Sequence, residues 1–136
     1  EEIRTQIPEV DAIVGTTAYD HIAEVIGEAL RGKRSERLDD LHKIALASGK
    51  RVLTTGGHYA YLKIAEGCDK HCTYCVIPKL RGNYRSVPMD ELVAEARKLA
   101  GNGTRELNLV AQETTVYGKD LYGERSLHIL LKKLAE

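Results

Sequence analysis

The C-terminal part of the sequence alternates between strand-like and helix-like segments, and this order restricts the possible folds more than any other feature. Residues 59–65 and 106–111 are largely apolar, with β-branched and aromatic side chains among them, as is typical of strands. Residues 89–100, and the segment that begins near Ser126, repeat apolar side chains at helical spacing. The order strand, helix, strand, helix predicts parallel strands joined by right-handed crossovers, and therefore an α/β fold.

A shorter strand and helix precede this region. Residues 10–14 resemble a strand, and residues 19–30 resemble a helix with one apolar face. The side chains of that face, which we expect to lie against a sheet, are Ile22, Val25, Ile26, Ala29 and Leu30. The periodicity stops in the polar run 31–37, which indicates the edge of a domain. We therefore predict a first domain over 1–35, a linker over 36–58 and a second domain over 59–136.

All three cysteines of the chain, Cys68, Cys72 and Cys75, follow the first strand of the second domain. Three thiolates from one short loop can bind three irons of a four-iron cluster and leave the fourth iron open for chemistry. A zinc site that includes His71 is an alternative, but His71 adjoins Cys72 and no second Cys or His pair follows at the usual spacing. Free buried cysteines are a further alternative, while the odd number disfavours a disulfide framework. The spacing favours an iron–sulfur cluster.

Gln112 and Glu113 directly follow the second strand of this domain. In parallel sheets and barrels the working face lies at the carboxyl ends of the strands. We therefore expect Gln112, Glu113 and the cysteines to face the same cavity.

The overall charge indicates neither nucleic acid nor an anionic membrane as a partner, because 20 basic residues balance 20 acidic ones. No apolar run approaches the roughly twenty residues that span a bilayer, and the N-terminus does not resemble a signal peptide. We expect no membrane association and a cytoplasmic location, where a reducing environment suits a labile thiolate-bound cluster.

The cysteine spacing, with Tyr74 before the last cysteine, resembles that of the radical S-adenosylmethionine (SAM) enzymes. Within that group, the pairs Ile77-Pro78, Arg81-Gly82 and Arg85-Ser86 are similar to the methylthiotransferases. Residues 109–115, Leu-Val-Ala-Gln-Glu-Thr-Thr, resemble the branch that modifies an aspartate of ribosomal protein uS12 (RimO-type), although many of its members carry Asp in place of Glu. The branch that modifies transfer RNA (MiaB-type) typically reads Gly-Gln-Asn there.

The resemblance implies a radical SAM (βα)6 partial TIM-like barrel that begins in residues 59–136 and is incomplete there. Residues 1–35 would be the C-terminal βα end of the methylthiotransferase N-terminal domain. The family binds a second 4Fe-4S cluster through three further cysteines of that domain, and the sequence contains none of them. We therefore expect a fragment that is inactive as a methylthiotransferase by itself.

The resemblance also implies the ligands of the cofactors. Cys68, Cys72 and Cys75 would bind a 4Fe-4S cluster whose fourth iron is chelated by SAM. An aromatic side chain would lie against the SAM adenine, and polar side chains at the strand end would hold its amino group or ribose. These SAM-binding residues would be Tyr74, Gln112 and Glu113.

The implied function is the addition of a methylthio group to an aspartate of ribosomal protein uS12, begun by reductive cleavage of SAM to a 5′-deoxyadenosyl radical. Ribosomal protein uS12 would be the protein substrate, and a flavodoxin or ferredoxin would be the electron donor. Two alternatives stay open: a transfer RNA methylthiotransferase of the same superfamily, and a non-catalytic metal-binding module.

Overall fold

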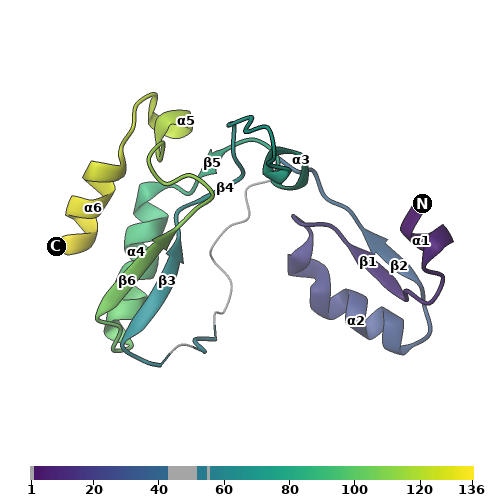
Figure 1. Ribbon diagram of the computed structural model, residues 1–136. Coiled ribbons are helices and arrows are strands. Elements are labelled where there is room, and N and C mark those ends of the chain that lie inside the picture. Colours follow the sequence, from purple (N-terminus) through teal and green to yellow (C-terminus); the bar gives the residue numbers. More distant parts are fainter. Residues whose placement is uncertain (1, 43–51, 55) are drawn as a thin grey trace. The chain divides into compact units, whose positions relative to one another are not determined.

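The computed structural model of the chain describes residues 2–42, 52–54 and 56–136 (Figure 1). The chain divides into two compact units, Glu1–Lys43 and Ile44–Glu136. Both units mix helices with short strands. The fold is therefore α/β, as the alternating pattern of the sequence predicts.

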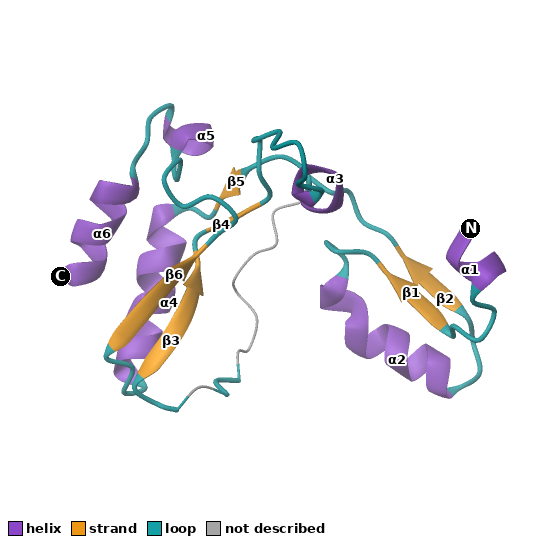
Figure 2. Cartoon of the chain, viewed as in Figure 1, coloured by secondary structure: helices purple, strands orange, loops and turns teal. Residues whose placement is uncertain are grey.

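The first unit is a small parallel βα arrangement. It contains helix α1 (Glu2–Gln6), strand β1 (Ala12–Val14), the 3₁₀-helix η1 (Tyr19–His21), helix α2 (Ile22–Leu30) and strand β2 (Ser35–Arg37). Strands β1 and β2 are parallel (Figure 2). Ala12 lies opposite Ser35 in the register of the two strands. The strand and helix expected in this part of the sequence are confirmed.

Strand β2 differs from the sequence prediction, which begins a linker at residue 36. Residues Ser35–Arg37 pair with β1 instead, because backbone groups form the ladder and any residue supplies them. Arg37 strengthens the arrangement by ion pairs with Glu24 and Glu28 of α2, at 3.1 Å and 3.2 Å. Residues 36 and 37 therefore belong to the first unit.

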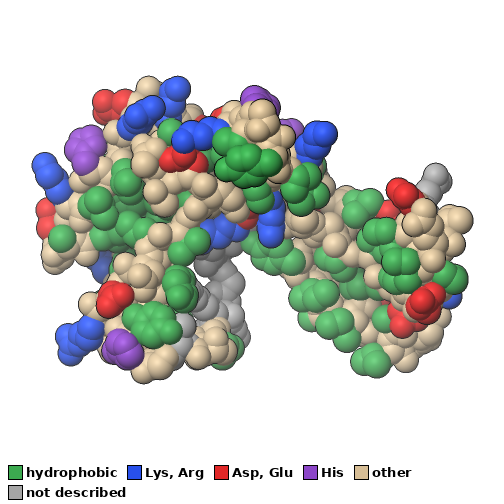
Figure 3. Space-filling view, viewed as in Figure 1, with side chains coloured by type: hydrophobic (Ala, Val, Ile, Leu, Met, Phe, Trp, Pro, Cys, Tyr) green, Lys and Arg blue, Asp and Glu red, His purple; other side chains and the backbone are tan. Residues whose placement is uncertain are grey.

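The apolar face of α2 is only partly covered. Val25 is 2% exposed, whereas Ile22, Ile26 and Leu30 remain exposed, Leu30 to 84%. Hydrophobic side chains are visible at the surface of this unit (Figure 3). We expected the whole apolar face of α2 to be buried, but of these four residues only Val25 is.

The second unit contains the alternating elements predicted from the sequence. Its elements in order are strands β3 (Tyr59–Lys63) and β4 (Ala65–Glu66), helix α3 (Ile77–Arg81), strand β5 (Arg85–Ser86), helix α4 (Met89–Gly101), strand β6 (Glu106–Val110), and helices α5 (Lys119–Tyr122) and α6 (Leu127–Ala135). Strands β3 and β6 are parallel over their whole length, and β4 and β5 are antiparallel. None of the helices in the described part of the chain is long and apolar enough to cross a membrane.

Helix α4 packs on one face of the β3–β6 pair, and α6 lies beside α4 (Figure 2). On β3, Ala60 and Leu62 are buried while Tyr61 and Lys63 are exposed, which is the alternation of a strand with one covered face. The buried core consists of Leu62, Ile64, Val87, Met89, Leu92, Ala96, Tyr117 and Leu130. This core holds the carboxyl ends of β3 and β6 side by side, which is where the cysteines and Gln112 follow.

Candidate functional site

The cysteine loop, residues 67–75, leaves the end of β4 and is fixed at its start. Gly67 has a φ of 78°, and a Cβ placed there would lie 2.1 Å from the carbonyl oxygen of Asn83. The Cys68 N–H donates to the Gly82 carbonyl oxygen at 3.2 Å. Asp69 Oδ1 accepts from the Tyr84 N–H at 2.9 Å. Only glycine fits this close approach, and the approach fixes the position of Cys68.

The three thiols differ in exposure. Cys68 is buried, Cys75 is half-buried and Cys72 is exposed, and all three are free of disulfide bonds. The Cys75 N–H donates to the Cys72 carbonyl oxygen at 3.0 Å, which closes a turn between them. Within the described ranges, no three His, Cys, Asp or Glu side chains lie near enough to share a metal ion.

The donor chemistry of the loop still fits a cluster. Three free thiols within one short loop are the soft ligands that iron–sulfur clusters use in proteins. The buried Cys68 is anchored, and the turn between Cys72 and Cys75 brings their backbones together. Gathering the three thiols therefore requires a change in the outer part of the loop.

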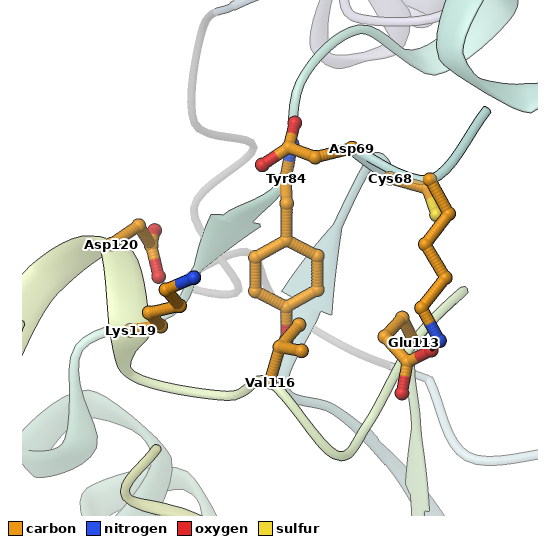
Figure 4. A pocket seen from close by; sticks show the side chains of 8 residues that line it. Cys68, Asp69, Tyr84, Glu113, Val116, Lys119 and Asp120 are labelled. Atoms are coloured by element: carbon orange, nitrogen blue, oxygen red, sulfur yellow. Dashed lines mark hydrogen bonds and ion pairs between the residues drawn. The ribbon is translucent and has the colours of Figure 1, made fainter. Parts of the chain in front are cut away.

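A pocket of about 300 Å³ adjoins the buried cysteine (Figure 4). Its lining residues are Cys68, Asp69, Lys70, Tyr84, Glu113, Val116, Lys119 and Asp120. The Tyr84 ring stands in the middle, with Cys68 and Glu113 on one side and Asp120 on the other. The prediction that the cysteine loop and the end of the next strand face one cavity is confirmed for Cys68 and Glu113.

Glu113 is held as an anion at the edge of this pocket. Its carboxylate forms an ion pair with Lys70 of the cysteine loop. It also accepts from the Thr115 N–H at 3.1 Å and from the Thr115 hydroxyl. The hydrogen bond from Lys70, followed by those from Thr115, lowers the pKa of Glu113 to about 2.

The other two predicted SAM ligands lie outside this pocket. Gln112 lines a separate hollow of about 370 Å³ with Tyr61 and Lys63, and its Nε2 donates to Glu66 Oε1 at 2.9 Å. Tyr74 is 91% exposed. The structure therefore brings Cys68 and Glu113 together at one pocket, and it does not bring Gln112 or Tyr74 there.

Sequence reasoning missed Glu66, which is buried beside the cysteine loop. Burial alone would raise its pKa, but Lys63, the Gly67 N–H and Arg81 outweigh that effect and lower it. Its position, directly before Gly67 at the end of a strand, is the signal that could have indicated a role, because an acidic residue there must find partners.

Asp120 was also missed, although it lines the pocket. Its carboxylate accepts from the Ser86 N–H at 2.7 Å and from the Ser86 hydroxyl at 2.6 Å. Arg85, the neighbour of Ser86, is buried and donates to the carbonyl oxygens of Asn83 and Arg81 at 2.5 Å and 3.0 Å. Sequence could not reveal the contacts between Ser86 and Asp120, because the two residues are 34 positions apart.

The comparisons with known proteins agree with this architecture. The family model of the radical SAM superfamily matches residues 62–135, which include the cysteine loop and both parallel strands apart from the first residues of β3. The chain is similar to three bacterial proteins, each named ribosomal protein uS12 methylthiotransferase RimO. Identity is 60% over 134 residues for the protein of Lachnoclostridium phytofermentans, 49% over 136 for that of Symbiobacterium thermophilum, and 46% over 136 for that of Clostridium tetani.

These alignments cover 98–100% of the chain but only 30%, 28% and 31% of the three relatives, in that order. The chain thus spans about 30% of the length of the curated relatives it matches. The family model covers more than half of the chain, and its match includes every cysteine. The chain belongs to the radical SAM superfamily, within which it resembles the uS12 methylthiotransferases.

Proposed function

We propose that this chain forms the SAM-cleaving part of a methylthiotransferase that adds a methylthio group to an aspartate of ribosomal protein uS12. One observation carries the proposal: Cys68, at the start of the cysteine loop, and Glu113, at the end of the adjacent parallel strand, line the same pocket. The relatives, whose names state this activity, support the choice of substrate.

Cys68, Cys72 and Cys75 would hold a 4Fe-4S cluster, which when bound supplies the electron for reductive cleavage of SAM. The Lys70–Glu113 ion pair would hold the cysteine loop against the end of β6. We retain Gln112 and Glu113 as proposed contacts of the SAM amino group or ribose. Tyr74, which is 91% exposed, would reach the adenine only after the outer part of the loop folds over it.

The architecture proposed for the whole protein is a (βα)6 partial barrel that begins with the β3–α4–β6–α6 arrangement of the second unit. The support is the parallel pairing of β3 and β6 with a helical crossover between them. We also propose that residues 1–37 are the βα end of an N-terminal domain, that 38–58 are the segment between domains, and that 59–136 are the radical SAM part. The first domain ends after Arg37 and not after residue 35, because an end at residue 35 would divide β2.

Methylthio transfer would require further components. A second 4Fe-4S cluster would need thiolates other than the three in these 136 residues. A flavodoxin or ferredoxin would donate the electrons. We propose a cytoplasmic location, since thiolate-bound clusters of low potential need a reducing compartment.

Anaerobic reconstitution tests the cluster. The chain should take up about four irons and four sulfides, and SAM should change the EPR spectrum of the reduced cluster. Serine in place of Cys68, Cys72 or Cys75 should abolish iron binding, whereas His71→Ala should retain it. Stoichiometric zinc that depends on His71 would instead support the zinc alternative.

The substrate requires a separate measurement. Ribosomal protein uS12, added to the reconstituted chain with SAM and a reductant, should increase the release of 5′-deoxyadenosine. Transfer RNA in place of uS12 is the control. An increase with transfer RNA alone would contradict the proposed substrate and favour the transfer RNA branch.

A further inference from the structure

Glu66 is a buried carboxylate to which the proposed function gives no role. It is 7% exposed and lies directly before the cysteine loop. Its Oε1 accepts from the Gly67 N–H at 3.2 Å and from Gln112 Nε2 at 2.9 Å. Its Oε2 forms an ion pair with Lys63, and Nη1 of Arg81 lies 3.8 Å away. One side chain thus contacts the start of the cysteine loop, the end of α3 and the end of β6.

These three segments must keep a fixed arrangement for a site to form between them. Gly67 begins the cysteine loop, Arg81 ends the helix that follows the loop, and Gln112 follows β6. A buried carboxylate is costly unless its oxygens are paired, so a shift of any one segment would leave part of its charge uncompensated. Movement of the three segments relative to one another would therefore cost free energy, because it would break contacts of Glu66.

Glu66 also determines which end of the Gln112 side chain is free. An ionised carboxylate can only accept hydrogen bonds, whereas a glutamine amide has a donor end and an acceptor end. Gln112 must therefore turn its NH₂ group towards Glu66, as the 2.9 Å contact shows. The carbonyl Oε1 is the end that remains for a ligand, and it can accept from an ammonium or a hydroxyl group.

We propose that Glu66 is a positioning residue that orients the Gln112 amide and sets the start of the cysteine loop relative to it. This inference deepens the proposed function and rests on it for the identity of the ligand, since SAM carries both an ammonium group and ribose hydroxyls. We assign Glu66 no direct contact with the cluster or with SAM. It acts through Gln112 and through the backbone of Gly67.

The main test is Glu66→Gln in the reconstituted chain, followed by the EPR change as SAM is added. The glutamine keeps the size of the side chain but can present its own NH₂ group, so Gln112 loses its fixed orientation. The side chains of Lys63 and Arg81 are 43% and 39% exposed, so water can solvate their charges in the variant. The substitution therefore leaves no buried charge without a partner. We expect unchanged iron content. The SAM midpoint, which is the SAM concentration that gives half of the EPR change, should rise about tenfold, the effect of roughly one hydrogen bond to a charged group.

Two control variants distinguish the orientation of Gln112 by Glu66 from a general effect of losing a carboxylate on SAM binding. Glu106→Gln makes the same substitution at the other end of β6, where Glu106 is exposed, and should leave the SAM midpoint unchanged. Gln112→Ala removes the group through which Glu66 is proposed to act. In that background Glu66→Gln should have almost no additional effect on SAM binding. A midpoint unchanged by Glu66→Gln, or a full tenfold effect that persists in Gln112→Ala, would overturn the proposal.

A second measurement needs neither iron nor SAM. In a ¹⁵N-labelled chain, the side-chain NH₂ signals of Gln112, identified by their loss in Gln112→Ala, should shift in Glu66→Gln and stay in place in Glu106→Gln. Unshifted signals in Glu66→Gln would overturn the Glu66 proposal. Shifted signals in Glu66→Gln, together with a wild-type chain that takes up no cluster, would overturn the proposed function and leave the positioning role of Glu66 supported.

Discussion

Lys70 of the cysteine loop and Glu113 at the end of β6 form an ion pair across the edge of the candidate pocket. The two residues are 43 positions apart in the sequence. Lys70 lies between Cys68 and Cys72, so the pair joins the middle of the proposed cluster-binding motif to the strand that carries the proposed SAM contacts.

The first prediction concerns the protonation of Glu113. Its pKa in the folded chain is about 2, against an ordinary value of 4.5, because Lys70 and Thr115 stabilise the carboxylate. A lowered pKa means that the interaction contributes stability above pH 4.5 and loses it as the pH falls from 4.5 to about 2. A ¹³C NMR titration of the Glu113 carboxyl should show this low midpoint. Lys70→Met should raise it, and Lys119→Met, which removes another pocket lysine, should not.

The second prediction concerns iron retention. Exposed ion pairs are weak, so Lys70→Met should speed the loss of iron to a chelator by only about two- to fivefold. The same increase should appear in the wild-type chain at high salt, which screens exposed charges. Exchanging the two charges, Lys70→Glu with Glu113→Lys, should restore much of the retention. A faster loss in the exchanged variant than in Lys70→Met would contradict a role for the pair.

The third prediction concerns Gly67. Alanine at this position would be strained by the positive φ and would also meet the Asn83 carbonyl oxygen at 2.1 Å. Gly103 has a φ of 97°, and, apart from its chain neighbours, no atom of the described residues lies within 4 Å of the place that an added methyl group would take. Gly103→Ala therefore isolates the cost of the backbone conformation, about 1 kcal/mol. Gly67→Ala should lower the free energy of unfolding by more than that and should impair iron uptake. Equal urea midpoints and equal iron contents in the two variants would contradict the close approach.

The fourth prediction concerns Ser86, whose hydroxyl donates to Asp120 Oδ1 at 2.6 Å and accepts from the Gly118 N–H at 2.9 Å. Ser86→Ala removes the acceptor of the buried Gly118 N–H and one of the two hydrogen bonds from Ser86 to Asp120, and it should cost about 1–3 kcal/mol in the free energy of unfolding. Ser126→Ala is a matched control, because Ser126 is equally buried but its hydroxyl makes, among the described residues, one hydrogen bond of 3.2 Å to the Glu124 carbonyl oxygen. In urea unfolding, Ser86→Ala should lower the free energy of unfolding clearly more than Ser126→Ala does. The reverse order would contradict the importance of the hydrogen bonds of the Ser86 hydroxyl.

The fifth prediction concerns the three thiols before metal is bound. Iodoacetamide should modify the exposed Cys72 first and the buried Cys68 last, because reaction requires access to the thiolate. Mass spectrometry of the digested chain gives the three rates. Urea should abolish the difference. Equal rates in the folded chain would mean that Cys68 is not protected by the contacts of Gly67 and Asp69.

The sequence predicted β3, α4, β6 and α6, because the apolar pattern of each identifies it, whereas the short elements α3, β5 and α5, and β4 as a strand separate from β3, were not predicted. The parallel pairing of β3 with β6 follows from a helix between them, and this pairing brings Cys68 and Glu113 to one pocket. Strand β2 was not predictable in this way. Its three residues, Ser-Glu-Arg, have no apolar alternation, and only the partner strand β1 makes them a strand.

The side-chain roles at the strand ends were harder to predict, because they depend on partners that periodicity does not reveal. Gln112 and Glu113 follow the end of β6, where Gln112 lies in a bend, and the two side chains line different hollows. Gln112 turns to Glu66, a charged residue for which sequence alone favours a solvent position. Tyr74 lies in the outer part of the loop, where no strand or helix determines its direction.

The residues that contact one another around the site are far apart in the sequence, and this separation affects the order in which the parts of the site fold. Glu66 and Gln112 are 46 residues apart, and the cysteine loop, α3 and α4 all lie within the segment that their contact closes. Closing a segment of this length costs conformational entropy that is recovered only when β3 and β6 pair. We expect the cysteine loop to reach its final geometry late, after the parallel ladder forms, so that metal capture follows folding and cannot nucleate it.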